Sequence, residues 1–248
     1  MEEIATQAFW LGLAKIIGVN VVLSGDNAVV IALAARSLPP RQQKLAILYG
    51  AGAAVILRIL LTVFAVALLA LPWLKICGGL LLFWIGIRLL VPGEGDGNID
   101  ASEHLLTAVR TILIADLVMS LDNVIAVAAA AGGSMMLLIL GLAISIPLVV
   151  FGATLLVTLM ERHPVIITIG AGLIGWVAGE MLVTDPAVMG WFAGLGVPFT
   201  EQKPHLGDLS IELVAGTAGM LLVVVLGSWL AKRPQSDMPS ERANRPNS

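Results

Sequence analysis

Long apolar runs separated by short polar breaks dominate the chain. A helix needs about 20 apolar residues to cross the hydrocarbon core of a bilayer, and each run is predicted to be helical because an open strand would leave backbone groups unpaired in lipid. The breaks predict seven membrane-spanning helices, over residues 8–35, 44–70, 72–91, 105–131, 135–159, 164–183 and 209–231.

Two polar tetrads interrupt this pattern, SGDN at residues 24–27 in the first run and SLDN at residues 120–123 in the fourth. A carboxylate at the centre of a membrane helix costs roughly 2.5–3.5 kcal/mol on insertion scales. Because the chain bears this cost twice in the same local context, the tetrads are predicted to be functional.

Superposing the tetrads aligns Asp26 with Asp122 and Asn20 with Asp116. The first and fourth spans run in opposite directions, so the aligned segments have inverted topology. The fold is therefore predicted to be all-α, with two inverted three-helix repeats plus a seventh helix. Many secondary transporters have this architecture and bind their substrate near the membrane midplane, between the repeats.

Basic residues at alternate ends of the spans set the orientation. The positive-inside bias places the N-terminus outside and the C-terminus in the cytoplasm. The predicted segments are a first repeat (1–91), an acidic, glycine-rich cytoplasmic linker (92–104), a second repeat (105–183), an extracytoplasmic loop (184–208), a seventh helix (209–231) and a disordered cytoplasmic tail (232–248).

Composition agrees with this class. Of the 248 residues, 58% are hydrophobic and 12% are charged, which is typical of a polytopic membrane protein and not of a soluble domain. Residues 1–4, MEEI, are acidic where a secretory signal is basic, so the first run is predicted to be a retained span. The single cysteine, Cys77, excludes an intrachain disulfide and a multi-cysteine zinc site.

Helical spacing groups the polar residues of the two spans into matching stripes. The stripes are Asn20, Ser24 and Asn27 in the first span, and Asp116, Ser120 and Asn123 in the fourth. On a straight helix Asp122 is rotated by about 120° from Asp116, so either the helix unwinds at the tetrad or the tetrad aspartates face a third helix. Gly25 favours unwinding in the first span, and Leu121 gives no such signal in the fourth.

Arg58 falls near the middle of the second span, where its side chain cannot readily reach the membrane surface. It is therefore predicted to pair with one of the buried acids. Such a built-in cation would neutralise the site and be displaced when a divalent ion arrives, which would couple occupancy to rearrangement.

Carboxylate, amide and hydroxyl oxygens without nearby cysteine or histidine suit Mg²⁺, Ca²⁺ or Mn²⁺ better than Zn²⁺ or Cu⁺. Met119 shares the Asp116 stripe and would add either a sulfur contact that favours Mn²⁺ or only a flexible filler in helix packing. The acids have a structural alternative as polar contacts that join helices. Burial and a bound cation act in opposite directions on carboxylate protonation, so exchange of protons for metal is also expected.

One further cluster stays open. His205, Asp208 and Glu212 share a helical face at the outer end of the seventh span. They would form either an external metal relay or a solvated charged rim.

The tetrads in the first and fourth spans, together with Asp116 before the second tetrad, resemble the TerC family of integral membrane proteins. The likeness extends from about Trp10 to Leu230. It implies divalent-metal handling, chiefly manganese export, the label of tellurium resistance, a distant relation to the lysine-exporter superfamily and a place in the bacterial cytoplasmic membrane. The site residues that the resemblance supports are Asp26, Asn27, Asp116, Asp122 and Asn123, with Glu180 in the sixth span as a further acid.

The sequence thus predicts a transporter that exports a divalent cation, with Mn²⁺ as the expected substrate and no permanently bound cofactor. Asp26, Asp116 and Asp122 would carry the ion. Asn27 and Asn123 would add neutral oxygens, and Ser24, Ser120, Asn20, Met119 and Arg58 would support them.

Three alternatives are weighed against this. Export of a cationic amino acid would use the same carboxylates, and the resemblance also allows a metal-delivery partner of secretion machinery. An intramembrane aspartyl protease is disfavoured because Leu23 stands where its G-x-G-D signature has glycine, so no enzyme activity is expected. No nucleic-acid partner is expected either.

Overall fold

The computed structural model describes residues 7–69, 71–91, 101–131, 134–200, 203–206 and 209–232. Most of the predicted linker and the tail after Lys232 lie outside these residues, as does Asp208. The described helices are α1 (Gln7–Leu23), α2 (Gly25–Ala35), α3 (Pro40–Leu69), α4 (Leu74–Leu90), α5 (Ala101–Ala131), α6 (Met135–Arg162), α7 (Val165–Val183), α8 (Pro186–Gly194) and α9 (Ile211–Ala231).

A small antiparallel sheet joins α8 to α9, in a region that the apolar pattern predicts only as a loop. Its strands are β1 (Phe199–Thr200), β2 (Lys203–Leu206) and β3 (Leu209–Ser210), in the order β1-β2-β3. Phe199 lies opposite Pro204, and His205 lies opposite Ser210. Among the described residues the apolar segments are therefore helical, and this short sheet is added to them.

Five of the described helices, α3, α5, α6, α7 and α9, are long and apolar enough to cross a membrane, and α1 with α2 makes a sixth if the bent pair is one span. The chain is thus a helical, polytopic membrane protein. The remaining predicted span corresponds to α4, whose 17 residues extend about 25 Å, less than the core thickness of about 30 Å. The count of seven spans and the inverted repeats stay predictions.

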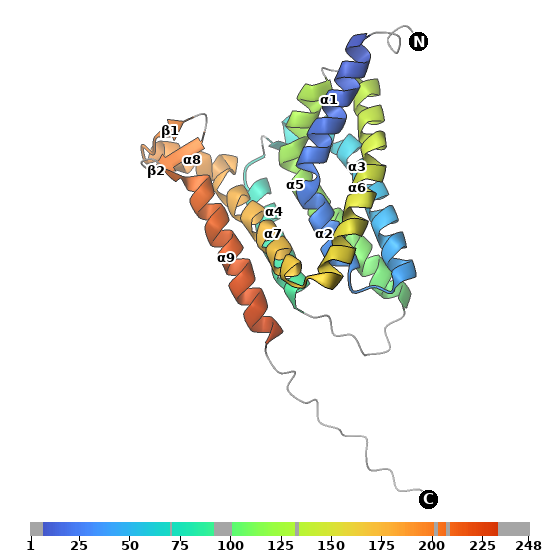
Figure 1. Ribbon diagram of the computed structural model, residues 1–248. Coiled ribbons are helices and arrows are strands. Elements are labelled where there is room, and N and C mark those ends of the chain that lie inside the picture. The colour runs from blue at the N-terminus through green and yellow to red at the C-terminus, as the bar shows by residue number, and fades with distance from the viewer. Residues whose placement is uncertain are drawn as a thin grey trace, which may run out of the picture.

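The helices form two groups (Figure 1). In the first, α3 packs along α5, and α1 and α2 pack against α6; in the second, α4, α7 and α9 pack together. The first two spans of each predicted repeat thus share one group, and the third spans share the other.

Small residues bring the two groups together. A methyl group on Gly170 of α7 would lie 2.7 Å from the Val29 side chain of α2, and one on Gly78 of α4 would lie 2.7 Å from the Val118 side chain of α5. The apolar core between them contains residues of both groups, including the fully buried Leu33, Leu82 and Ile174. Helices that meet through glycine approach closely enough for dense packing without a larger side chain between them.

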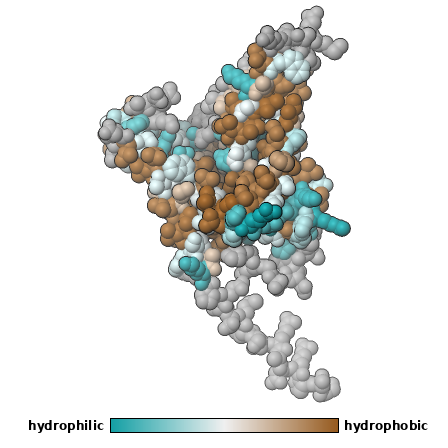
Figure 2. Space-filling model, in the orientation of Figure 1, coloured by the Kyte–Doolittle hydropathy of each residue, from teal (hydrophilic) through white to brown (hydrophobic). Residues whose placement is uncertain are grey.

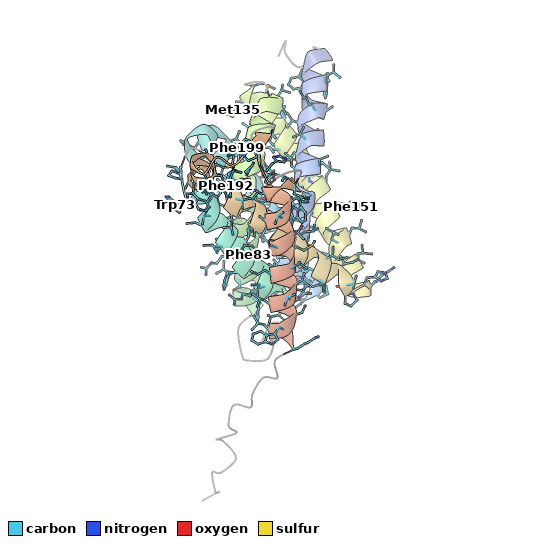
Figure 3. The ribbon with its side chains drawn as sticks, turned by 90° about the vertical axis from the view of Figure 1, so that its left-hand side faces the viewer. Trp73, Phe83, Met135, Phe151, Phe192 and Phe199 are labelled. Carbon is cyan, nitrogen blue, oxygen red and sulfur yellow. The ribbon has the colours of Figure 1, made fainter. Side chains whose placement is uncertain are left out.

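The face of the molecule in Figure 2 shows broad apolar areas over the helices. Trp73 just before α4, and Met135 and Phe151 in α6, are exposed (Figure 3), and Phe151 is 70% exposed. Such exposure would be costly in water and is expected where lipid is the solvent, because lipid tails are as apolar as these side chains.

Candidate functional site

The first apolar run is broken at its polar tetrad. α1 ends at Leu23 and α2 begins at Gly25, with a bend of 50° between them. A side chain added at Gly25 would have no neighbour within 4 Å. The unwinding that Gly25 predicts is confirmed in the first span, whereas α5 continues without interruption through Leu121.

Each side of the break is stabilised by a tetrad residue. Asp26 lies in the first turn of α2, where a negative charge is favourable, and its Oδ1 accepts a 2.8 Å hydrogen bond from the backbone N–H of Asn27. On the other side, the side-chain amide of Asn123 in α5 donates a 3.1 Å hydrogen bond to the backbone carbonyl of Leu23. Asn123 therefore replaces a helical hydrogen bond that the break removes.

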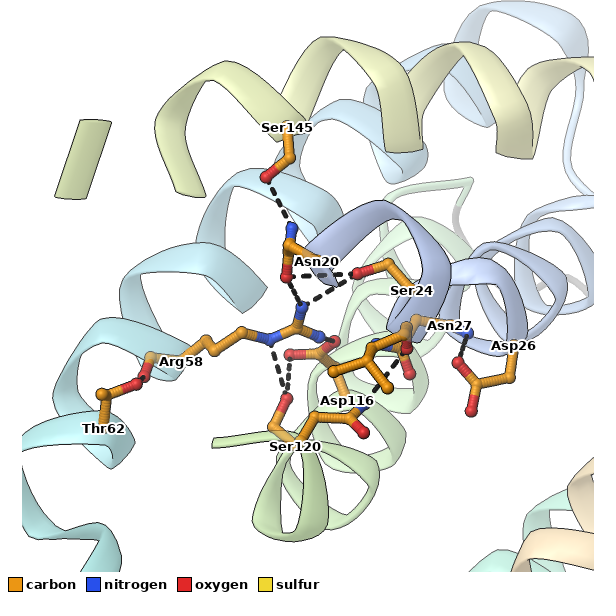
Figure 4. A network of polar contacts seen from close by, with 11 residues as sticks. Asn20, Ser24, Asp26, Asn27, Arg58, Thr62, Asp116, Ser120 and Ser145 are labelled. Atoms are coloured by element: carbon orange, nitrogen blue, oxygen red, sulfur yellow. Dashed lines mark hydrogen bonds and ion pairs between the residues drawn. The ribbon is translucent and has the colours of Figure 1, made fainter. Parts of the chain in front are cut away.

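Beside the break, the guanidinium of Arg58 reaches from α3 into a ring of oxygen atoms (Figure 4). Its Nη2 lies 2.6 Å from Asp116 Oδ1 and its Nε donates a 3.0 Å hydrogen bond to Ser120 Oγ. Its Nη1 donates to Asn20 Oδ1 at 2.7 Å and to Ser24 Oγ at 3.0 Å. Helices α1 and α5, together with Ser24 between α1 and α2, therefore direct oxygen atoms at one buried cation.

The charges of this ring are buried, so each needs a partner of opposite sign. Arg58 is 3% exposed and Asp116 is 5% exposed, and the two form an ion pair. Ser120 also donates a 3.2 Å hydrogen bond to Asp116 Oδ2. The predicted pairing of Arg58 with a buried acid is confirmed, and the acid is Asp116.

A further polar residue, Ser145 of α6, completes the network and was not predicted from the sequence. Asn20 Nδ2 donates a 2.5 Å hydrogen bond to Ser145 Oγ. The signal that points to it is modest: Ser145 is the only hydroxyl residue between Met135 and Ala153, two residues before Pro147. Isolated serines in apolar helices are common, so spacing alone does not mark this one.

A small cavity adjoins the guanidinium. The centre of a water molecule can occupy about 20 Å³ of this cavity. The cavity therefore has room for one water or one bare ion. Asn27 lines it, is only 2% exposed, and within the described residues has no hydrogen-bond partner for either side-chain amide atom. The lining residues are Asn20, Ser24, Asn27, Ile31, Ala51, Ala54, Val55, Arg58, Asp116, Ile146 and Val149.

Other predicted site residues lie elsewhere. Asp26 is partly buried and does not line the cavity, and Met119 is packed in the main apolar core. Glu180 of α7 accepts a 2.7 Å hydrogen bond from Trp176 one turn earlier and does not line the cavity either. Met119 therefore faces the apolar core, and Glu180 bonds a residue of its own helix.

The acids do not gather into one cluster among the described side chains. No group of three or more His, Cys, Asp or Glu residues in that part of the chain is placed to hold a metal ion. The side chain of Asp122 lies outside the described residues, although its backbone is part of α5. Asp116 is the one carboxylate among the described residues that line the cavity.

The fold and this network define a polytopic helical membrane protein with a buried, charge-paired polar site beside a broken helix. The chain matches the integral membrane protein TerC family over residues 5–235 and belongs to that family. No solved structure matches it significantly.

Two of the similar curated proteins are membrane proteins by name. An uncharacterized membrane protein of Bacillus subtilis, YjbE, is 44% identical over 177 residues, which cover 71% of this chain and 81% of the relative. A second from the same organism, YceF, is 27% identical over 97% of this chain and 91% of the relative. The Escherichia coli protein YegH is 28% identical over 67% of this chain, but only 35% of the relative is covered.

Proposed function

We propose that this protein is a transporter that exports a divalent metal cation, with Mn²⁺ as the expected ion. In this proposal the ion occupies the oxygen ring that the Arg58 guanidinium fills in the structure. The four surrounding oxygens come from a carboxylate, an amide and two hydroxyl groups. Oxygen ligands of this kind suit hard and borderline cations.

The observation that carries the proposal is that one buried cation already lies in this ring. When a metal ion enters, Arg58 must leave, because two cations in one buried site repel strongly. Its departure frees Asp116 to bind the ion. A divalent ion brings one more positive charge than the guanidinium, so a second carboxylate is required, and Asp26 and Asp122 are the acids that the tetrads supply.

The free cavity beside the ring is small, and this favours a single ion over a larger substrate. A cavity of about 20 Å³ has room for one bare ion or one water. Asn27 lines it, and among the described residues its amide oxygen has no hydrogen-bond partner. An amino acid is several times larger and would need the helices to separate.

A second candidate is a cationic amino acid, and one observation favours it. The ring already binds a guanidinium, which is the side-chain group of arginine, through Asp116, Asn20 and two serines. A transported arginine would displace Arg58 in the same way. Competition between substrates distinguishes this candidate from metal transport.

The test is Mn²⁺ flux in proteoliposomes containing the purified full chain. We compare the unmodified protein with Asp116→Asn, Asp26→Asn and Asp122→Asn, and with Glu161→Gln as a control, because Glu161 is exposed at the end of α6. The proposal expects flux from the unmodified and control chains, and at least a tenfold loss in the Asp116 variant. Equal flux in all chains, or none above empty vesicles, contradicts it.

Two additions to this assay separate the remaining proposals. Excess arginine or lysine that suppresses Mn²⁺ flux and is itself transported favours the amino-acid candidate. An imposed pH gradient that changes the rate supports proton exchange, and indifference to the gradient removes it. Tight Mn²⁺ binding without flux would instead favour a metal-delivery role.

A further inference from the structure

The side-chain amide of Asn20 is held at both ends. Its Oδ1 accepts the 2.7 Å hydrogen bond from Arg58, and its Nδ2 donates to Ser145 Oγ. The two ends of an amide are chemically opposite, one an acceptor and the other a donor. The partner at each end therefore decides which end faces the cation.

In the structure Ser145 accepts from Asn20 and does not donate to it. The hydroxyl has one hydrogen, and Ser145 Oγ directs it to the backbone of its own helix, 2.8 Å from the Leu142 carbonyl and 3.1 Å from the Gly141 carbonyl. The side chain is fully buried, at 0% exposure, so no solvent competes for these bonds. The lone pairs of Ser145 Oγ therefore face Asn20, and they are satisfied only by an N–H donor from that side chain.

A reversed amide would be unfavourable at both ends. Asn20 would then present its oxygen to the lone pairs of Ser145 and its NH₂ group to the guanidinium of Arg58. Both contacts oppose like partial charges in a buried place, where unsatisfied polar groups are costly. The hydroxyl on α6 thus transmits a fixed polarity through Asn20 to the ring.

We propose that Ser145 is a positioning residue that makes the ring selective for cations by holding the carbonyl oxygen of Asn20 toward the ion. The inference rests on the proposed function, since the ion is the divalent cation that replaces Arg58. Amide oxygen binds such ions and amide NH₂ does not. Without Ser145, Asn20 is free to rotate and presents an N–H group to the ion for part of the time.

The first test is Mn²⁺ binding to the purified full chain, measured by calorimetry. Ser145→Ala is expected to weaken binding by about 10- to 100-fold, the range for residues that orient metal ligands. Thr154→Ala is the matched control. Thr154 is an exposed residue of the same helix whose hydroxyl also bonds its own backbone, 2.8 Å from the Val150 carbonyl, and its removal leaves binding unchanged.

Repeating Ser145→Ala in a chain that already carries Asn20→Asp shows whether Ser145 acts by orienting Asn20 or only by packing. In Asn20→Asp both ends of the side chain are oxygen, so orientation no longer matters for an ion. Adding Ser145→Ala to Asn20→Asp is then expected to change Mn²⁺ affinity by less than about twofold. A loss in this background as large as in the unmodified chain shows that Ser145 acts only through packing, and overturns the inference.

Thermal unfolding without metal tests the role of Ser145 independently of the proposed metal transport. The thermal midpoint of the unmodified chain is expected to fall by about 2–4 °C on Ser145→Ala, and not to fall further when Ser145→Ala is added to Asn20→Leu. Additive shifts contradict the role of Ser145 whether or not the chain binds metal. If the unmodified chain does not bind Mn²⁺ but the shifts are non-additive, the proposed function fails while the control of Asn20 by Ser145 stands.

Discussion

The side-chain nitrogen of Asn123 lies 3.1 Å from the carbonyl oxygen of Leu23 and donates a hydrogen bond to it. Leu23 is the last residue of α1, so its carbonyl has lost the helical partner that a continuous helix would provide. Asn27, the counterpart of Asn123 in the first tetrad, has no partner for its amide among the described residues. The two corresponding asparagines therefore differ in role: Asn123 supports the break, and Asn27 lines the cavity.

Removing the Asn123 amide should destabilise the break. Asn123→Ala leaves the Leu23 carbonyl without a donor, and we expect a loss of about 1–3 kcal/mol in stability, measured by thermal unfolding in detergent. Thr111→Ala is the control, because the Thr111 hydroxyl bonds only its own helix, at the Thr107 carbonyl. Equal shifts for both variants would show that the amide contributes nothing to the break.

Arg58 and Asp116 should depend on each other. Arg58→Met leaves the Asp116 carboxylate buried without its cation, and breaking a buried pair in this way costs about 3–5 kcal/mol. Arg58→Met with Asp116→Asn removes both charges and is expected to recover most of that stability, while Mn²⁺ flux stays lost. A double variant no more stable than Arg58→Met contradicts the pairing argument.

The contact between α7 and α9 should not tolerate a methyl group at Gly179. Its added carbon would overlap the backbone carbonyl of Ala215, and overpacking of this kind costs about 1–3 kcal/mol or more. Gly152→Ala in α6 is the control, because the new methyl group has no neighbour within 4 Å and gains up to about 1 kcal/mol of helix propensity. Thermal midpoints that move in opposite directions are the expected result.

Asp185 should hold the start of α4 in place. Its fully buried carboxylate accepts hydrogen bonds from the backbone N–H groups of Trp73, Lys75, Ile76 and Ala187. Asp185→Ala leaves these donors unpaired, and we expect amide hydrogen exchange at Trp73 and Lys75 to accelerate at least tenfold. Exchange at Leu213, which a separate cap at Ser210 protects, should stay unchanged. Unaltered exchange at Trp73 would contradict this role.

The sequence by itself determined the features that depend on single segments. Apolar runs of about 20 residues specify membrane helices because lipid leaves the backbone no other partner. Gly25 marked the break in the first span because glycine tolerates irregular dihedrals. Arg58 was predicted to pair with an acid because a charge in mid-span cannot reach water.

Only the tertiary structure decided which partners meet. It selected Asp116 for Arg58, assigned Asn123 to the Leu23 carbonyl, brought Ser145 to Asn20, and turned Met119 and Glu180 away from the cavity. These outcomes depend on how each helix is rotated about its axis. In a membrane the lipid-facing and core-facing sides are both apolar, so the periodicity that orients a helix in a soluble protein is missing, and only packing against neighbouring helices sets the rotation.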